Sequence, residues 1–286
     1  MSTGPHVAVV TDTTTYMPAE LIQRLGIREV SLYVGWGGNL EREDSYTDLR
    51  AFYSRLDETT DLPKTSQPSV GDFRAVYEPL IAEGREIVSI HIAESLSGTC
   101  ASAREAAGEL AADRAEARIE VVDASTGAAG LACLVIAAAE AANAGADTDA
   151  VLATVERARE QLDIWFCLDT LEYLRKGGRI GAAQALLGSA LQIKPILTFG
   201  AEIEPVGRVR THARARRRMQ EYLVELHNRE ATDWVVQHAQ SPEDADWLVD
   251  QGREILGSEP LFRTEVGPVL GAHLGSGMLV GGMVRG

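Results

Sequence analysis

Cysteine is scarce in this chain, and its pattern excludes several kinds of site. The 286 residues include three cysteines, which are far apart and form no CxxC pair, and the six histidines are dispersed without an HExxH motif. The usual zinc-binding patterns and a disulfide framework are therefore absent from the sequence. We expect Cys100, Cys133 and Cys167 to be buried thiols of a reduced protein, and we expect no metal and no cofactor.

Long apolar runs and excess positive charge are also lacking. The longest apolar run, residues 127–139, ends at Glu140 and is shorter than the roughly 20 residues that a membrane span needs. The N-terminal residues show neither the basic nor the apolar region of a signal peptide. The formal net charge is −15, which argues against a nucleic-acid partner because phosphate contacts need a basic surface. The sequence therefore indicates a soluble, cytoplasmic protein.

What the first part of the chain does contain is an alternation of short apolar strands and helical stretches. Residues 7–10, 87–92 and 118–122 read as strands, and helical periodicity follows each of them. Such an alternation is typical of a mostly parallel, doubly wound sheet. We predict an N-terminal α/β domain that spans residues 1–160.

The pattern changes near residue 163. Residues 194–199 and 202–206 flank Gly200-Ala201 and predict a β-hairpin. Hairpins among helices suggest a second, α+β domain with a mixed sheet, and we place it at residues 161–286. The fold class is thus predicted as α/β with two domains.

Three local expectations complete the secondary-structure prediction. Residues 29–34 are expected to form one strand, and residues 180–190 one helix. The tail, residues 267–284, alternates apolar residues with glycines, which predicts two strands joined at Gly275-Ser276-Gly277.

The turn Ser95-Leu96-Ser97-Gly98-Thr99 lies between a predicted strand and a predicted helix. A helix start has unpaired N–H groups and partial positive charge, so it suits a carboxylate or a phosphate. Ser97 can donate its hydroxyl to such an anion, and Gly98 permits a close approach to the backbone. Serine and threonine before a helix are also common N-caps, so both interpretations stay open.

Two further polar segments are candidates for a ligand site. Asp12 and Thr13 follow the first strand, at the carboxyl end where open α/β sheets bind ligands, although a plain Asx turn fits equally well. The segment Lys64-Thr65-Ser66-Gln67-Pro68 is expected to be extended because a residue before proline avoids the helical region. Ser69 is explained by a capping box, whereas Thr65 to Gln67 have no such structural role.

Several motifs, taken together and in order, resemble the DegV family of bacterial fatty-acid-binding proteins, the FakB-type carriers. They span almost the whole chain and comprise Val9-Val10-Thr11-Asp12, Lys64-Thr65-Ser66-Gln67-Pro68-Ser69, Leu96-Ser97-Gly98-Thr99, the stretch from Asp169 to Ile180 (DTLEYLRKGGRI), and the stretch from Gly267 to Gly275 (GPVLGAHLG).

The resemblance implies that one long-chain fatty acid lies in a tunnel between the two domains. It places the carboxylate at Thr65 and Ser97, assisted by the N–H of Gly98, and puts Arg175 and His273 beside the head group. It further implies a non-catalytic carrier that presents the fatty acid to a separate ATP-dependent fatty acid kinase, which makes the acyl phosphate.

Additional candidates surround this predicted head-group site. They are Asp12, Thr13, Ser66, Ser95, Thr99 and Arg179, the last of which we expect in an interdomain contact. The arginine-rich run Arg208–Arg218 stands out in an acidic chain. It is either a solvated helix face or a docking patch for an acidic kinase or, transiently, an anionic membrane surface.

Two other functions compete with the carrier. One is an α/β serine hydrolase with Ser97 as nucleophile. Its base would be His91 or His273, and its orienting carboxylate Asp12 or Asp123. Ser97 lacks the preceding glycine of the G-x-S-x-G motif. The other is a small phosphate-ligand binding protein, for which no P-loop sequence is present.

Overall fold

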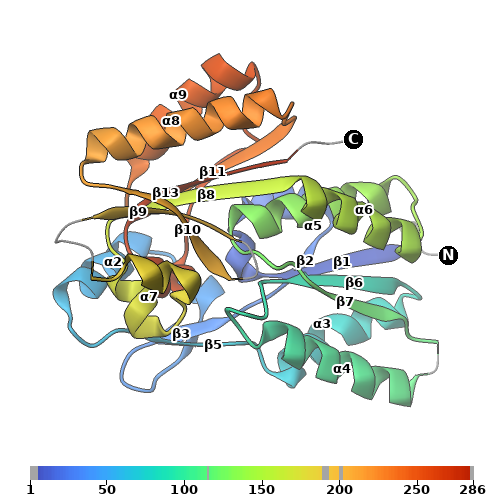
Figure 1. Cartoon of the computed structure of the whole chain (residues 1–286). Coiled ribbons are helices and arrows are strands. Elements are labelled where there is room, and N and C mark those ends of the chain that lie inside the picture. The colour runs from blue at the N-terminus through green and yellow to red at the C-terminus, as the bar shows by residue number, and fades with distance from the viewer. Residues whose placement is uncertain (1–5, 115, 189–192, 200–201, 284–286) are drawn as a thin grey trace.

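Two β-sheets with helices on their faces organise the molecule (Figure 1). The computed structural model describes residues 6–114, 116–188, 193–199 and 202–283. From one end of Figure 1 to the other, the layers are helices α3 and α4, a parallel sheet, helices α5 and α6, a mixed sheet, and helices α8 and α9. This confirms the predicted α/β class with a parallel sheet and a separate mixed sheet.

The first sheet has four parallel strands. In spatial order they are β2 (Arg28–Val30), β1 (Val7–Asp12), β6 (Glu86–His91) and β7 (Ile119–Asp123). The accompanying helices are α1 (Ala19–Leu25), α3 (Val70–Ala82), α4 (Thr99–Asp113), α5 (Ala129–Asn143) and α6 (Thr148–Gln161). Val10, Tyr77 and Leu110 belong to the buried cluster that joins this sheet to α3 and α4. The predicted capping box of α3, Ser69 with Asp72, is present.

A small antiparallel sheet lies beside the first one. Its strands are β4 (Glu41–Arg42), β3 (Tyr33–Gly35) and β5 (Lys64–Ser66), and it is accompanied by the 3-10 helix η2 (Glu43–Ser45) and by α2 (Leu49–Glu58). The predicted single strand over residues 29–34 is therefore wrong. Val30 ends a strand of the parallel sheet, and Tyr33 begins a strand of the small sheet, so the two parts pair with different partners.

The second large sheet has six strands and is mixed. In spatial order they are β10 (Ile203–Val209), β9 (Lys194–Phe199), β8 (Leu162–Leu168), β13 (Gly277–Met283), β11 (Asp233–Ala239) and β12 (Phe262–Glu265). Helices α8 (His212–Asn228) and α9 (Pro242–Leu256) cover one face, where Trp165 stacks on Tyr222 with ring centroids 4.8 Å apart. The predicted β9–β10 pairing is confirmed, while Gly200 and Ala201 lie outside the described residues.

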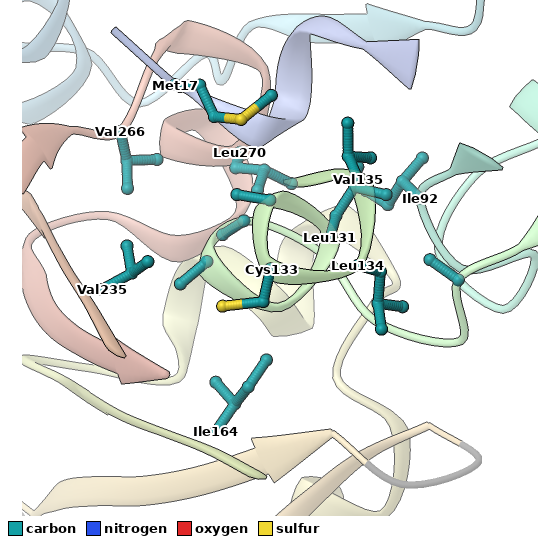
Figure 2. Close-up of a cluster of buried hydrophobic side chains, with 14 of the residues drawn as sticks. Met17, Ile92, Leu131, Cys133, Leu134, Val135, Ile164, Val235, Val266 and Leu270 are labelled. Atoms are coloured by element: carbon teal, nitrogen blue, oxygen red, sulfur yellow. The ribbon is translucent and has the colours of Figure 1, made fainter. Parts of the chain in front are cut away.

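Helix α5 is buried between the two large sheets. Figure 2 shows Leu131 and Val135 of this helix surrounded by side chains from both halves of the chain, among them Ile92 and Ile164. Small residues let the sheets approach closely, since a Cβ on Gly130 would lie 2.1 Å from Cδ1 of Ile164. Because one core includes residues from both halves, the boundary between residues 160 and 161 stays a prediction.

The glycine-rich tail is not a hairpin, so that prediction is wrong. Pro268 begins a short helix, α10 (Pro268–Leu274), and a single strand, β13, follows. Proline is favoured at the first helical position. The glycines that suggested strands instead allow close packing: a Cβ on Gly271 would lie 2.5 Å from the hydroxyl oxygen of Tyr53.

The stretch after β8 also differs from its prediction. It contains helix α7 (Glu172–Gly177) and then the 3-10 helix η3 (Gly181–Leu186) instead of one helix over residues 180–190. Gly181 has φ of 51°, which an α-helix does not accommodate. Residues 189 and 190 lie outside the described residues.

The expectations for the cysteines and for long apolar segments can be compared with the structure. All three cysteines are buried, and none forms a disulfide. Within the described ranges, no helix is long and apolar enough to cross a membrane.

Because α5 is packed on all sides, we predict that Leu131→Ala lowers the free energy of unfolding by about 2–5 kcal/mol, the range for a buried leucine. Leu131 is fully buried, whereas Leu261 is 37% exposed. The matched control Leu261→Ala is expected to change stability by less than about 1 kcal/mol. Urea unfolding of both variants checks this, and equal losses would contradict the central role of α5.

Candidate functional site

An enclosed, largely apolar pocket lies between the two halves of the chain. Its cavity volume is about 140 Å³, below the roughly 300–1,000 Å³ typical of small-molecule sites, so a long ligand requires its lining side chains to move apart. Most of its lining is apolar and comes from both halves: Leu32, Ile92, Leu96, Ala128, Phe166, Leu174, Phe199, Ile203, Val269, Leu270 and Leu274. Such a lining suits a hydrocarbon ligand.

Polar side chains are confined to one group of segments around this pocket. They are Thr65, Ser66 and Gln67 from β5 and the residue after it, Ser97 from the turn before α4, Arg179 after α7, and His273 from α10, and Gly98 lines the pocket beside Ser97. Thr65, Ser97, Gly98 and His273 were predicted as head-group residues, and the fold brings all four to one pocket. Whether they bind a ligand head group stays a prediction.

Thr65 and His273 form a hydrogen bond although 208 residues separate them in sequence, with 2.8 Å between Oγ1 and Nε2. Burial, and secondarily the positive charge of Arg179, lowers the pKa of His273 to about 4. The ring is therefore neutral near pH 7, and only one of its nitrogens carries a hydrogen.

The surroundings of His273 indicate which nitrogen that is. Its Nδ1 is buried and has no hydrogen-bond partner among the residues that the structure describes, and it faces Gly177, where a Cβ would lie 2.3 Å away. A buried donor without an acceptor is costly, so we assign the hydrogen to Nε2. Thr65 then accepts this hydrogen bond, and its own O–H stays available for a ligand oxygen.

The turn before α4 supplies the second hydroxyl. Ser97 Oγ lies 2.8 Å from Oγ1 of buried Thr99, and Gly98 is the N-cap of α4 without a side-chain cap. The first N–H groups of this helix have no intrahelical acceptor. A Cβ on Gly98 would lie 2.4 Å from the amide oxygen of Gln67, so glycine permits the two polar segments to meet.

The two predicted arginines occupy different places. Arg179 donates from Nε to the carbonyl of Leu96 at 3.1 Å and from a terminal nitrogen to the carbonyl of Gly177 at 2.7 Å. It thereby connects the turn before α4 with the end of α7. Arg175 is exposed, pairs with Glu172 at 2.8 Å, and does not line the pocket.

Four of the additional candidates, Asp12, Thr13, Ser95 and Thr99, also lie outside the pocket lining. Ser95 is exposed. Buried Asp12 accepts hydrogen bonds from Thr14 and from the N–H of Ile92 at 3.0 Å, which fixes the chain that leads into the Ser97 turn. Thr13 donates its hydroxyl to Glu43 at 2.5 Å. Ser66 does line the pocket, and its hydroxyl donates to the carbonyl of Gln67.

The hydrolase arrangement is not assembled around Ser97. His91 lies between Asp12 and Ser89, at 3.0 Å from Oδ2 and 2.7 Å from Oγ, and all three side chains are fully buried. Ser89 in turn accepts a hydrogen bond from Tyr77. The hydroxyl of Ser97 contacts Thr99 and no imidazole, so it lacks the general base that activates a serine nucleophile.

The described part of the chain contains no group of three or more histidine, cysteine or acidic side chains arranged to hold a metal ion.

The apolar residues that line the pocket, including Phe166, Phe199 and Ile203, were not predicted from the sequence. These residues look like ordinary strand residues, and only the assembled sheet shows which of them face the pocket. Gln67 was noted for its position, and it does reach the pocket.

The fold and this site define an α/β protein with an enclosed apolar pocket and a hydroxyl-rich polar end. The family model described as "Uncharacterised protein, DegV family" matches residues 6–284. A DegV domain-containing protein of Streptomyces coelicolor is 38% identical over 277 residues, which cover 96% of each chain. The chain belongs to the DegV family.

Solved structures of the family share this architecture. One, described as fatty acid binding of a DegV family protein from Thermus thermophilus, has a TM-score of 0.85 and 31% identity and covers 98% of this chain and 100% of that one. Bacillus subtilis DegV, described as a fatty acid binding protein, has a TM-score of 0.87 and 28% identity, with coverage of 99% and 100%.

We predict that the ring of His273 stays neutral as the pH falls from 8 to about 5, because its pKa is lowered to about 4. A depressed histidine pKa favours folding above the unfolded value of about 6.5, and this contribution is lost as the pH falls from there toward the folded value. An NMR titration of the Cε1–H resonance checks the prediction, and a midpoint above pH 6 would contradict it.

Proposed function

We propose that this protein binds one long-chain fatty acid, with its hydrocarbon tail in the apolar pocket and its carboxylate at Thr65, Ser97 and Gly98. The observation that carries the proposal is the pairing of an enclosed apolar pocket with two hydroxyls and a helix start at one place. The descriptions of the Thermus thermophilus and Bacillus subtilis relatives as fatty acid binding support it.

Burial of the tail supplies most of the binding free energy in this proposal. Each buried methylene contributes about 0.8 kcal/mol, so about fourteen of them contribute roughly 11 kcal/mol before association costs. The head group then needs its hydrogen bonds satisfied more than it needs a strong ion pair, since a buried carboxylate without donors is costly. Hydroxyl donors meet that need.

The proposed role is that of a non-catalytic, cytoplasmic carrier that presents the carboxylate to a separate ATP-dependent fatty acid kinase for acyl phosphate formation. Two features support this role. The polar end of the pocket includes the exposed side chains of Gln67 and Arg179, so the head group lies near the surface. Ser97 has no general base beside it, so the site is suited to holding a carboxylate and not to activating a nucleophile.

The arginine-rich run provides a docking surface for this proposal. Arg208, Arg210 and Arg214 are exposed, and no acidic side chain in the described ranges pairs with them, whereas Arg216 pairs with Asp244. Unpaired positive charge on an acidic protein suits an acidic patch of the kinase, or a transient contact with an anionic membrane surface, through which ligand is exchanged.

Loss of either hydroxyl is expected to weaken fatty acid binding. Thr65→Val keeps the shape of the side chain and removes the donor, and Ser97→Ala does the same for the second hydroxyl. A hydrogen bond to a charged group contributes about 1.5–3 kcal/mol, so each variant should lose roughly tenfold to a hundredfold in affinity for palmitate, measured by titration calorimetry. Native mass spectrometry of the purified wild type should show one bound fatty acid.

Thr154→Val is the matched control because Thr154 lies in α6, outside the pocket lining. It should bind as the wild type does. A folded wild-type protein that neither carries nor takes up a long-chain fatty acid would refute the proposed function. Unchanged affinity in both hydroxyl variants would refute the head-group assignment alone.

A further inference from the structure

Strands β1 and β6 are joined by side chains where they end near the pocket. The described backbone pairing of β6 with β1 ends at Ser89. Beyond it, the hydroxyl of Thr11 donates to the carbonyl of Ile90 at 2.9 Å. Oδ2 of Asp12, the last residue of β1, accepts a hydrogen bond of 3.0 Å from the N–H of Ile92, directly after β6. The relative position of the two strand ends therefore depends on these side-chain contacts.

The carboxyl group of Asp12 is fully buried and is surrounded by donors. Besides the N–H of Ile92, Oδ2 accepts a hydrogen bond of 3.0 Å from Nδ1 of His91. Oδ1 accepts one from the N–H of Thr14 at 3.1 Å and one from its hydroxyl at 2.5 Å. Four donors thus converge on two oxygens, which is the arrangement of a carboxylate. Since a buried carboxylate is tolerated only with such partners, each donor helps to fix its orientation.

The imidazole of His91 is itself held by a chain of hydroxyl groups. Tyr77 donates to Oγ of Ser89 at 2.7 Å, which leaves the hydrogen of Ser89 for Nε2 of His91, also at 2.7 Å. The hydrogen of the ring then lies on Nδ1, where it faces Asp12. The ring of Phe73 packs edge-on against the imidazole, with 5.0 Å between the centroids. A fixed imidazole therefore orients one oxygen of the Asp12 carboxylate.

Ile92, whose N–H binds this carboxylate, begins the segment that leads to the head-group residues. The carbonyl of Ala93 accepts hydrogen bonds from the N–H groups of Leu96 at 2.9 Å and Ser97 at 3.1 Å, so the turn is closed on Ala93. The N–H of Ala93 donates to the carbonyl of Thr126 at 2.9 Å, which holds the turn on its other side. Asp12 is thus the link between this turn and β1.

We propose that Asp12 and His91 are positioning residues for the head-group site. The imidazole orients the Asp12 carboxylate, and this carboxylate holds the start of the turn so that Ser97 and Gly98 face the carboxylate of the ligand. Neither positioning residue lines the pocket, so both act through the turn. This proposal rests on the proposed function, since it concerns how firmly the same site binds the head group.

The test compares two ligands of equal chain length, dodecanoate and dodecan-1-ol, by titration calorimetry. His91→Leu removes the donor to Asp12 and keeps an apolar side chain against Phe73. It should weaken dodecanoate binding by roughly tenfold, as for the loss of one well-oriented hydrogen bond, and dodecan-1-ol binding by less than about twofold. Equal losses for both ligands would reveal a general effect on the pocket and would overturn the proposal, and so would unchanged binding of dodecanoate.

Two variants of similar shape extend this test. His91→Asn keeps an amide donor on the side of Nδ1, so it should bind dodecanoate within about threefold of the wild type. If it does not, the effect belongs to ring packing on Phe73 and the proposal fails. Asp12→Asn presents one oxygen and one NH₂ group where four donors converge. It should lose dodecanoate affinity as His91→Leu does, and it provides the test if His91→Leu does not fold by circular dichroism.

Ser89→Ala is the matched control. Ser89 is as fully buried as His91 and belongs to the same chain of hydrogen bonds, but its replacement leaves the contacts of Asp12 with His91 and Ile92 in place. The ratio of the two ligand affinities should stay that of the wild type. The same change of this ratio in Ser89→Ala would overturn the proposal, because the effect would then follow the stability of the buried chain.

Hydrogen exchange of the delipidated protein separates this proposal from the proposed function. In His91→Leu the N–H of Ser97 should exchange about tenfold faster, while the N–H of Ile87, bonded to the carbonyl of Arg118 within the sheet, should keep its wild-type rate. An equal rise at both would overturn the proposal. If the wild type binds neither ligand while the N–H of Ser97 alone responds, the proposed function fails and the positioning of the turn by His91 stands.

Discussion

Helix α5 has few side chains larger than leucine, and both large sheets pack against it. Small residues such as Gly130 bring Ile164 of the mixed sheet into contact with the helix, so one hydrophobic core includes residues from both halves of the chain. The position of the pocket depends on this packing. Ala128, directly before α5, lines the pocket together with Ile92 from one half and Phe166 from the other. The two halves of the chain must therefore keep this relative position for the pocket to form between them.

The polar end of the pocket depends on contacts that are remote in sequence. Thr65 lies in β5 and its partner His273 in α10, while Arg179 binds the carbonyl of Leu96 across 83 positions of the chain. None of these contacts is strong by itself. Their effect is to keep the donors oriented, and an oriented donor needs less reorganisation to bind the carboxylate of the proposed ligand.

The sequence predicted the parts of this arrangement that are set locally. Strand, turn and helix around Ser97 follow from neighbouring residues, and so does the capping box of Ser69 and Asp72. The helix in the tail was not predicted, because its Gly271 is required for close packing on Tyr53. Tyr53 lies more than two hundred positions away in the sequence. Arg175 and Arg179 look alike in sequence, yet only Arg179 lines the pocket, since Glu172 lies within reach of Arg175. Which arginine lines the pocket, and which secondary structure the tail adopts, both depend on tertiary packing.

A net charge of −15 raises the question of how the anionic head group of the proposed ligand is tolerated. Exposed charges act over about 8–10 Å in physiological salt, so the groups nearest the pocket decide the local field. There the neutral His273 adds no charge, Arg179 adds one positive charge at the surface, and hydroxyls supply the donors. Neutral donors hold a carboxylate without the deep minimum of a buried ion pair. This balance agrees with the proposed carrier role, in which the ligand is released as well as bound.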